Sequence, residues 1–521
     1  MKNSINKKQI SLLLISFISG FSVMIVELTA ARAVAPVIGS SVYTWTSVIG
    51  VILLGLSIGG YVGGYLIDRY KSTRMLSGFL FSAAFFIGLI PFILKNISYF
   101  VLADLSILNI ILLISITLFF LPAIFLGCLS PTILKLYSED VENIGKQFGS
   151  ITALWSLGSI VGTFLTGFYL TGTIGTSNSF FFVSFMLFLL AITILIVSRK
   201  SSVKKQILFS FLVFSLVFIC FAEEQKTNDN NLIFSSESNY YKIAVIDNFF
   251  MEKDARFLFL DFDSHSIENK DSENLNIYTA IHPIFLAFKN DIKDIFVIGG
   301  GSYKIAKNFS SFYKDAEVVV SEIDPEVTKV AEDFFHLKDY SIKTINEDAR
   351  FTLNNSEKKY DVVFGDAYNS FISVPWYLIT FEFNEVVKKH LKYKGIYAIN
   401  FMSSLKGENQ LFESILKTFK ETFVNSYVIA YGANKEDVQN IVLLGVNSDE
   451  KISYSELVDR IKKVENGENL WNKIVPQDRF SVSRNALVLT DDFAPIERLM
   501  RPLINNYFSD YSKFFYSLFS S

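Results

Sequence analysis

Cysteine, histidine and charge are all scarce in this chain. Of 521 residues only two are cysteine and four are histidine. Charged residues make up 19% of it, against about 25% in an average soluble protein. Cys128 and Cys220 lie inside apolar runs, so they offer no polar pair for a disulfide or a metal. The histidines have no ligand-like spacing, and a net charge of −3 indicates no polyanionic partner. We therefore expect neither a metal site nor nucleic-acid binding.

Apolar residues are abundant and fill the first part of the chain. A helix needs about 20 apolar residues to cross a bilayer. Runs of this kind lie at 10–36, 43–67, 75–94, 106–134, 148–171 and 178–198, and a shorter uncharged run lies at 206–222. The first run is too long for a cleavable signal peptide. Residues 1–222 are therefore predicted to form a multi-pass α-helical transmembrane bundle of about seven helices in a lipid bilayer.

Lysine and arginine fall on alternate loops of this region. They precede the first run and follow the second, fourth and sixth, and the opposite loops carry little beyond Lys95. The positive-inside rule then predicts a cell-membrane protein with a cytoplasmic N-terminus. Seven crossings place the C-terminal half outside the cell. If 206–222 lies in the interface, or 95–137 crosses twice, that half returns to the cytoplasm, and the sequence leaves this open.

Two further features of the apolar region carry structural expectations. Gly55, Gly59 and Gly63 recur four residues apart, which predicts close packing between helices. Glu27 and Arg32 lie in or near the end of the first run, where charge is expensive. They either pair with each other or face a polar cavity.

The rest of the chain reads as an ordinary soluble protein. Residues 223–231 are polar and are predicted to be a linker, and 232–290 contain the short runs of a small β-rich lobe. From 291 to 521, strands alternate with helices, which predicts a mostly parallel α/β sheet of Rossmann-like type. Ligands of such sheets bind at the carboxyl ends of the strands.

Four candidate site motifs follow successive predicted strands. They are the triplet Gly299-Gly300-Gly301, then Glu322, then Asp348-Ala349, and then Asp366. Each alone is equally consistent with a turn or a helix cap. Together they fit a nucleoside ligand without phosphate: glycines for close backbone approach, Glu322 for both ribose hydroxyls and Asp348 for an adenine amino group. Lys304 occupies the position of the third glycine of the dinucleotide pattern, so S-adenosyl chemistry is favoured over NAD.

These residues also carry a family resemblance. IGGGS, SEIDPEV, EDAR and YDVVFGDAY resemble the successive motifs of spermidine synthases, the polyamine aminopropyltransferases. The stretch ELTAARAVAPVIGSSVYTWTSVIGVILLGLSIGG is similar to the membrane-fused branch of that family, as are LPAIFLGCLSP and LTDDFAPIERL. The resemblance implies a methyltransferase-type Rossmann-like domain, of the kind that binds S-adenosylmethionine, behind a multi-pass helical region.

The resemblance also implies roles for individual residues. Asp366 matches the catalytic aspartate that holds and deprotonates the attacking amine. The implied nucleoside-binding residues are Gly299, Gly301, Glu322, Asp348, Ala349 and Pro375. The positions expected to bind the amine are Tyr241, Tyr278, Ser302, Tyr368, Asn369 and Trp376. The aromatic rings of Tyr368 and Trp376 are equally consistent with apolar packing over the site.

Several of these positions depart from the family pattern. Ser302 and Asn369 stand where soluble members carry aspartates, and Tyr241 and Thr279 replace a glutamine and a histidine. A diamine has two positive charges, so loss of these carboxylates weakens its binding. The positions expected to bind the nucleoside donor therefore match the family pattern more closely than those expected to bind the amine acceptor.

The family activity is aminopropyl transfer from decarboxylated S-adenosylmethionine to an amine, putrescine to spermidine, with release of methylthioadenosine. These nucleosides are co-substrates, and no permanently bound cofactor is expected. Two alternatives stay open. One is an enzyme that consumes S-adenosylmethionine with another acceptor or none, by cyclisation or lyase chemistry. The other is a non-catalytic membrane sensor or transport-linked binder of a nucleoside or polyamine. Homo-oligomerisation and any transported molecule are not settled by the sequence.

Overall fold

The computed structural model divides the chain into two compact units. The first comprises residues 1–230 together with Glu237–Asn239, and the second comprises the remainder. Each unit is described by itself. The residues that the structure describes are 7–97, 107–138, 143–197, 203–224, 231–250, 253–261, 263–269, 277–367, 374–407, 409–432, 434, 436–464, 467, 470–480 and 482–503.

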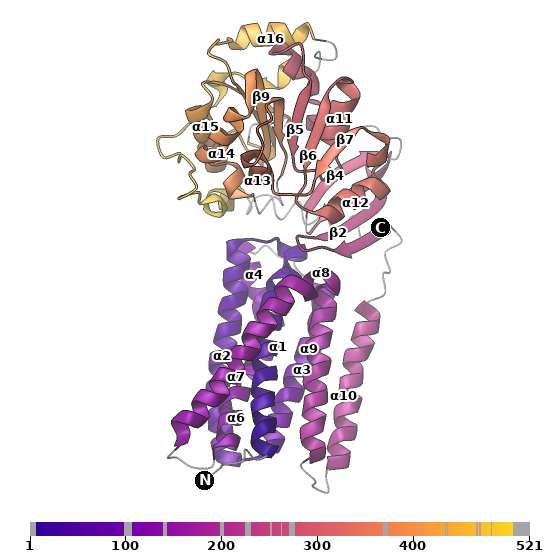
Figure 1. Cartoon of the computed structure of the whole chain (residues 1–521), viewed down its shortest axis with the longest axis vertical. Coiled ribbons are helices and arrows are strands. Elements are labelled where there is room, and N and C mark those ends of the chain that lie inside the picture. The colour runs from indigo at the N-terminus through magenta and orange to yellow at the C-terminus, as the bar shows by residue number, and fades with distance from the viewer. Residues whose placement is uncertain are drawn as a thin grey trace. The chain divides into compact units, whose positions relative to one another are not determined.

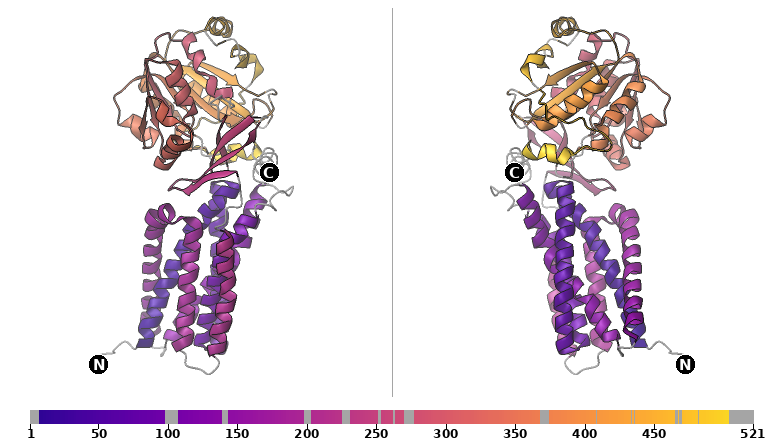
Figure 2. Two further views of the ribbon diagram at one scale, coloured as in Figure 1. Left: turned by 90° about the vertical axis from the view of Figure 1, so that its right-hand side faces the viewer. Right: turned by 90° about the vertical axis from the view of Figure 1, so that its left-hand side faces the viewer.

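The first unit is a bundle of helices that run alongside one another (Figures 1 and 2). Among the described residues, seven helical spans are long and apolar enough to cross a membrane, which confirms the predicted helical region. The fourth and fifth contain short π-helical segments, η1 and η3. The elements are α1 (Lys7–Ile38), α2 (Val42–Tyr70), α3 (Thr73–Ile97), α4 (Ile107–Ser115), η1 (Ile116–Phe120), α5 (Leu121–Gly127), α6 (Leu129–Tyr137), α7 (Ile144–Leu165), η3 (Thr166–Leu170), α8 (Thr171–Thr173), α9 (Gly175–Val197) and α10 (Val203–Glu224).

The predicted glycine face of α2 packs directly against the fourth span. A Cβ atom on Gly55 would lie 2.6 Å from the Cβ of Ala123, and one on Gly63 would lie 2.6 Å from the Cα of Cys128. A Cβ on Gly59 would overlap the carbonyl oxygen of Ile124. The absence of side chains along this face therefore lets the two helix backbones approach closely.

Arg32 and Glu237 have partners within the helical unit. The Arg32 guanidinium donates to the carbonyl oxygens of Ser238 (2.7 Å) and Asn239. The Glu237 carboxylate accepts from the backbone N–H (2.9 Å) and hydroxyl (3.0 Å) of Thr176, at the start of α9. Arg32 thus binds backbone carbonyls of the segment Glu237–Asn239, an arrangement that the sequence did not suggest.

The second unit begins with the small β lobe. It is a four-stranded sheet in the order β1-β2-β3-β4, and the pairs β2–β3 and β3–β4 are antiparallel. The strands are β1 (Leu232–Glu237), β2 (Lys242–Phe250), β3 (Lys253–Leu260) and β4 (Asp263–Asn269). Most of the expected linker lies outside the described residues, but its first two residues, Glu223 and Glu224, belong to α10.

The Rossmann-like domain contains an eight-stranded mixed sheet. Its order is β12-β10-β11-β9-β8-β5-β6-β7, in which the strands from β9 to β7 pair in parallel and β9, β11, β10 and β12 pair antiparallel. The central strands are continuous apolar runs because helices cover both faces of a parallel sheet. The strands are β5 (Asp294–Ile298), β6 (Glu317–Ser321), β7 (Ile342–Ile345), β8 (Tyr360–Gly365), β9 (Leu391–Ser403), β10 (Asn425–Ala430), β11 (Gln439–Val446) and β12 (Ile474–Val475).

Helices follow the strands as the alternation predicted. Asp324 caps α12 through the N–H of Glu326, and Pro325 supplies a fitting first helical residue. The helices are α11 (Lys304–Phe312), α12 (Pro325–Phe334), α13 (Ala349–Asn354), α14 (Phe381–Lys389), α15 (Gln410–Thr422) and α16 (Tyr454–Lys462), with 3₁₀ turns η4 (Ile277–Ala280), η5 (His282–Ala287), η6 (Leu337–Asp339), η7 (Trp376–Leu378), η8 (Trp471–Lys473) and η9 (Gln477–Arg479). This order brings the ends of β5, β6 and β8 to one edge of the sheet.

Candidate active site

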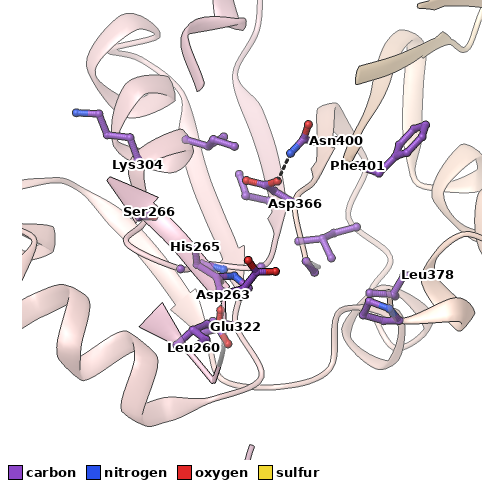
Figure 3. Close-up of a pocket in the computed structure, with 18 of the residues that line it drawn as sticks. Leu260, Asp263, His265, Ser266, Lys304, Glu322, Asp366, Leu378, Asn400 and Phe401 are labelled. Carbon is purple, nitrogen blue, oxygen red and sulfur yellow. Dashed lines mark hydrogen bonds between the residues drawn. The ribbon is translucent and has the colours of Figure 1, made fainter. Parts of the chain in front are cut away.

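A cavity of about 540 Å³ opens at the carboxyl ends of the parallel strands, between the sheet and the β lobe. Nine of the predicted site residues line it, including the proposed catalytic aspartate (Figure 3). These are Tyr241, Tyr278, Gly299, Gly301, Glu322, Asp348, Ala349, Asp366 and Pro375. The topology thus gathers residues separated by more than a hundred positions in the chain.

The turn after β5 approaches the end of β8 very closely. Gly299 has a φ of +88°, and a Cβ atom there would lie 2.8 Å from the backbone oxygen of Asp366. Gly301 also has a positive φ, of +53°. Glycine is therefore required at Gly299 both by backbone conformation and by space.

Glu322 fixes this turn from the end of β6. Its Oε2 accepts from the N–H of Gly300 (2.7 Å), and its Oε1 accepts from the N–H of Asp324 (2.9 Å). The side chain is buried, and this burial raises the pKa of the carboxyl group, whereas the backbone hydrogen bonds oppose the rise. A buried carboxylate oxygen can accept further hydrogen bonds, so Glu322 retains acceptor capacity toward the cavity.

Asp348 serves as a helix cap and as a cavity residue at once. Its Oδ1 accepts from the N–H of Phe351 (2.9 Å), which caps α13, and its Oδ2 accepts from the hydroxyl of Tyr377 (2.9 Å). The helix-cap interpretation of this aspartate and its position at the cavity are therefore compatible.

Asp366 is held by two donors. Asn400 Nδ2 donates to its Oδ1 at 2.8 Å, and the Tyr278 hydroxyl donates to its Oδ2 at 3.3 Å. The carboxylate faces the cavity but lies deep within the domain, and this burial raises its pKa to about 6, whereas both hydrogen bonds lower it. A carboxylate with a pKa near the working pH suits a general base.

The four remaining predicted positions lie elsewhere. Tyr368 and Asn369 fall outside the described residues. Trp376 is 43% exposed and is not among the cavity-lining residues, whereas its neighbour Tyr377 lines the cavity. Ser302 is fully buried next to the cavity wall and also does not line it.

Ser302 belongs to a buried polar cluster beside the cavity. Its hydroxyl donates to Glu268 Oε1 at 2.6 Å, and Lys307 Nζ donates to both oxygens of Glu268 at 2.9 and 3.0 Å. Lys304 Nζ lies 3.9 Å from Glu268 Oε2. The Glu268 carboxylate therefore already accepts hydrogen bonds from a lysine and from a hydroxyl group.

Sequence reasoning missed several cavity residues. The most important is Asn400, a polar residue within the apolar strand β9, and this unusual position was the available signal. Asp263, His265 and Ser266 line the cavity from β4, a strand that the sequence did not predict. Arg350, which does not line the cavity, was also overlooked. It binds both oxygens of Asp491, which ties the LTDDFAPIERL segment to α13.

Comparison with known proteins finds similarity to spermine/spermidine synthases and polyamine aminopropyltransferases. Residues 278–439 match the family described as Spermine/spermidine synthase domain. The chain is 25% identical over 414 residues to the polyamine aminopropyltransferase of Oceanobacillus iheyensis, covering 75% of this chain and 77% of that protein. It is 23% identical over 263 residues to a probable polyamine aminopropyl transferase of Bifidobacterium longum, covering 48% of this chain and 58% of the relative. A probable spermidine synthase from Corynebacterium glutamicum superposes with a TM-score of 0.39 at 20% identity, over 44% of this chain and 87% of that structure.

Proposed function

Because the C-terminal part of this chain carries a spermine/spermidine synthase domain, we propose that it is a membrane-anchored aminopropyltransferase. In this proposal the enzyme transfers a three-carbon aminoalkyl group from a sulfonium nucleoside to an amine and releases methylthioadenosine. Decarboxylated S-adenosylmethionine is the donor and putrescine the acceptor to test first. The observation that carries the proposal is Asp366, a carboxylate held at the strand ends by Asn400 and Tyr278.

The proposed reaction is a nucleophilic substitution at carbon. The amine nitrogen attacks the propyl carbon next to the sulfonium, a C–N bond forms, and the C–S bond breaks with its electrons returning to sulfur. Methylthioadenosine leaves as a neutral thioether. An alkyl ammonium group, with a pKa near about 10 like that of lysine, must first lose one proton, and Asp366 is the group assigned to take it and pass it to water.

In the same proposal, the nucleoside occupies the cavity beside the Gly299 turn. Glu322 accepts hydrogen bonds from the ribose hydroxyls, and Asp348 with Ala349 faces the adenine. The Asp348 oxygens have other donors in Phe351 and Tyr377, which fix the carboxylate in place. Pro375 covers the thioether side, and Tyr241 and Tyr278 border the amine path.

The buried cluster around Ser302 favours a second candidate. Because Glu268 already has donors from Ser302 and Lys307, this corner adds little attraction for an ammonium group. This polar cluster is therefore consistent with an enzyme that uses S-adenosylmethionine itself, or one whose acceptor is not a diamine.

The two candidates are separated by product release from the purified full chain. The protein is incubated in detergent with either nucleoside, with and without putrescine, and methylthioadenosine is measured by chromatography. We expect release only with decarboxylated S-adenosylmethionine plus putrescine. If methylthioadenosine release is the same with and without putrescine, or requires S-adenosylmethionine, the second candidate function replaces the first.

A matched pair of variants tests the role of Asp366. Asp366→Asn should reduce release by at least about 10²-fold, the lower range for loss of a general base, and should leave methylthioadenosine binding in place. Asp339→Asn, at an exposed surface aspartate, is the control and should retain full activity. Equal activity of the two variants would remove Asp366 from the mechanism.

A further inference from the structure

The last helix of the bundle, α10, packs one of its faces against α3 and α9. Phe214 stacks on Phe188 of α9 with ring centroids 3.9 Å apart, and Phe221 contacts Phe181 at 4.2 Å. Phe214 and Val217 are only 3% and 2% exposed. A helix lying flat at the membrane interface would not bury these residues along neighbouring helices, so α10 is a seventh span.

The fourth span crosses only once. Residues Leu108–Tyr137 form one helical run, and its packing follows the glycine face of α2 from Gly55 to Gly63. The far end of this run is fixed beside the end of α2, where Lys135 and Asp68 form an ion pair at 2.7 Å. Two crossings within the described residues 107–137 would need a reversal, whereas Leu108–Tyr137 is a single helical run.

An odd number of spans puts the two ends of the helical region on opposite faces. The basic residues mark one face: Lys8 lies in the first turn of α1, Arg69 and Arg74 flank the α2–α3 turn, and Lys135 and Lys146 flank the connection from α6 to α7. The positive-inside rule makes this the cytoplasmic face. The end of α10 therefore lies at the other face.

The segment that follows α10 gives independent support. Ser238 and Asn239 accept from Arg32, which lies in the last two turns of α1, and Glu237 accepts from Thr176 at the start of α9. Both partners belong to the bundle end opposite the basic residues. Residues 225–230 are too few and too polar to cross a bilayer again, which takes about 20 apolar residues.

We infer that the domain bearing Asp366 faces the non-cytoplasmic side of the membrane. Among its described helices none is long enough to span, so the domain stays on the side where α10 ends. The cavity then takes its nucleoside and its amine from outside the cytoplasm. A transport reaction must therefore deliver such substrates to that side. This inference depends on membrane insertion, and not on which reaction the cavity performs.

Cysteine labelling in intact cells tests the sidedness without any assay of activity. Cys128 and Cys220 are first replaced by alanine in the full chain. Single cysteines are then introduced at two exposed lysines, Lys314→Cys in the Asp366 domain and Lys146→Cys at the basic end of the bundle. A membrane-impermeant maleimide is applied before and after permeabilisation, and labelling of denatured membranes sets the full signal.

We expect the cysteine at 314 to react in intact cells and the one at 146 to react only after permeabilisation. The opposite pattern, or reaction of both from the same side, overturns the inference. A phosphatase fused after Ser521 provides a second readout, because this reporter is active only outside the cytoplasm. An inactive phosphatase combined with a fluorescent cytoplasmic reporter at the same point would also overturn it.

Discussion

Asn400 Nδ2 donates to Asp366 Oδ1 across 2.8 Å, so β9 positions the carboxylate at the end of β8. The parallel register of the two strands, with Gly365 opposite Ile399, places these two residues side by side. The hydrogen bond stabilises the ionised carboxylate and opposes the effect of burial on its pKa. Asn400 is therefore a positioning residue for the proposed base.

The pH dependence of the reaction should report this hydrogen bond. A base works only when ionised, so activity should rise with pH through the Asp366 pKa of about 6 and level off above it. Asn400→Leu removes a hydrogen bond that stabilises the ionised carboxylate and should therefore raise the pKa of Asp366. The rising part of the pH profile, its acid limb, should move to higher pH. A hydrogen bond to a charged group contributes about 1.5–3 kcal/mol, which corresponds to a move of about one to two pH units.

Tyr278→Phe provides a graded comparison for this pH experiment. Its hydroxyl donates to the same carboxylate at the longer distance of 3.3 Å, so the limb should move in the same direction but less. Both profiles are measured as kcat/KM against pH. An unchanged limb in Asn400→Leu, with activity retained, would show that Asp366 does not set the pH dependence.

Nucleoside affinity should depend on the charge of Glu322. Glu322→Gln keeps the shape of the side chain but makes it neutral, and charge-assisted hydrogen bonds are about twice as strong as neutral ones. We expect methylthioadenosine to bind about tenfold more weakly, or about 1.4 kcal/mol, as measured by calorimetry on the full chain. Glu326→Gln, on the adjoining helix α12 and outside the cavity lining, should bind normally.

The sequence was sufficient to predict the strand ends that build the cavity. The strands DIFVI, EVVVS and YDVVFG contain the unbroken apolar stretches IFVI, VVV and VVF, so their ends were recognisable, and Gly299, Glu322 and Asp366 follow from them. The apolar spans were equally clear, because a bilayer-crossing length of about 20 residues is a strong signal.

Residues whose position depends on long-range register could not be predicted. Asn400 faces Asp366 only because β9 pairs with β8 in one particular register, which local sequence does not encode. Trp376 and Tyr377 are adjacent in the 3₁₀ turn η7, and only the turn's orientation decides that Tyr377 lines the cavity. The run FSSESNYYKIAVID contains two strands, β1 and β2, because the chain reverses within it.

Close packing in the helical unit can be tested with neighbouring glycines. Gly59→Ala should destabilise the bundle by about 1–3 kcal/mol, the usual effect of overpacking, because the new methyl group meets the backbone of Ile124. Gly60→Ala is the matched control, since a Cβ there has nothing within 4 Å. Thermal unfolding of the full chain in detergent should separate the two, and equal midpoints would mean that α2 and α5 are not in contact.

Removal of one partner of the buried pair Lys307–Glu268 should destabilise the domain around the cavity. Glu268 is 7% exposed and Lys307 is 3% exposed, so Glu268→Gln leaves the Lys307 charge buried without its counter-ion. Removal of one partner of a buried ion pair typically destabilises by about 3–5 kcal/mol, and unfolding of the full chain by denaturant should show a loss of this size.

The surface pair of Lys338 and Asp333 supplies the control for this experiment. Both side chains are largely solvated, at 61% and 45% exposure, so Asp333→Asn should leave the unfolding midpoint unchanged. Double replacement by Lys307→Met and Glu268→Leu removes both charges together and should recover much of the stability lost in Glu268→Gln. If the double variant is no more stable than Glu268→Gln, the loss arises from packing around β4 and α11 and not from an unpaired charge.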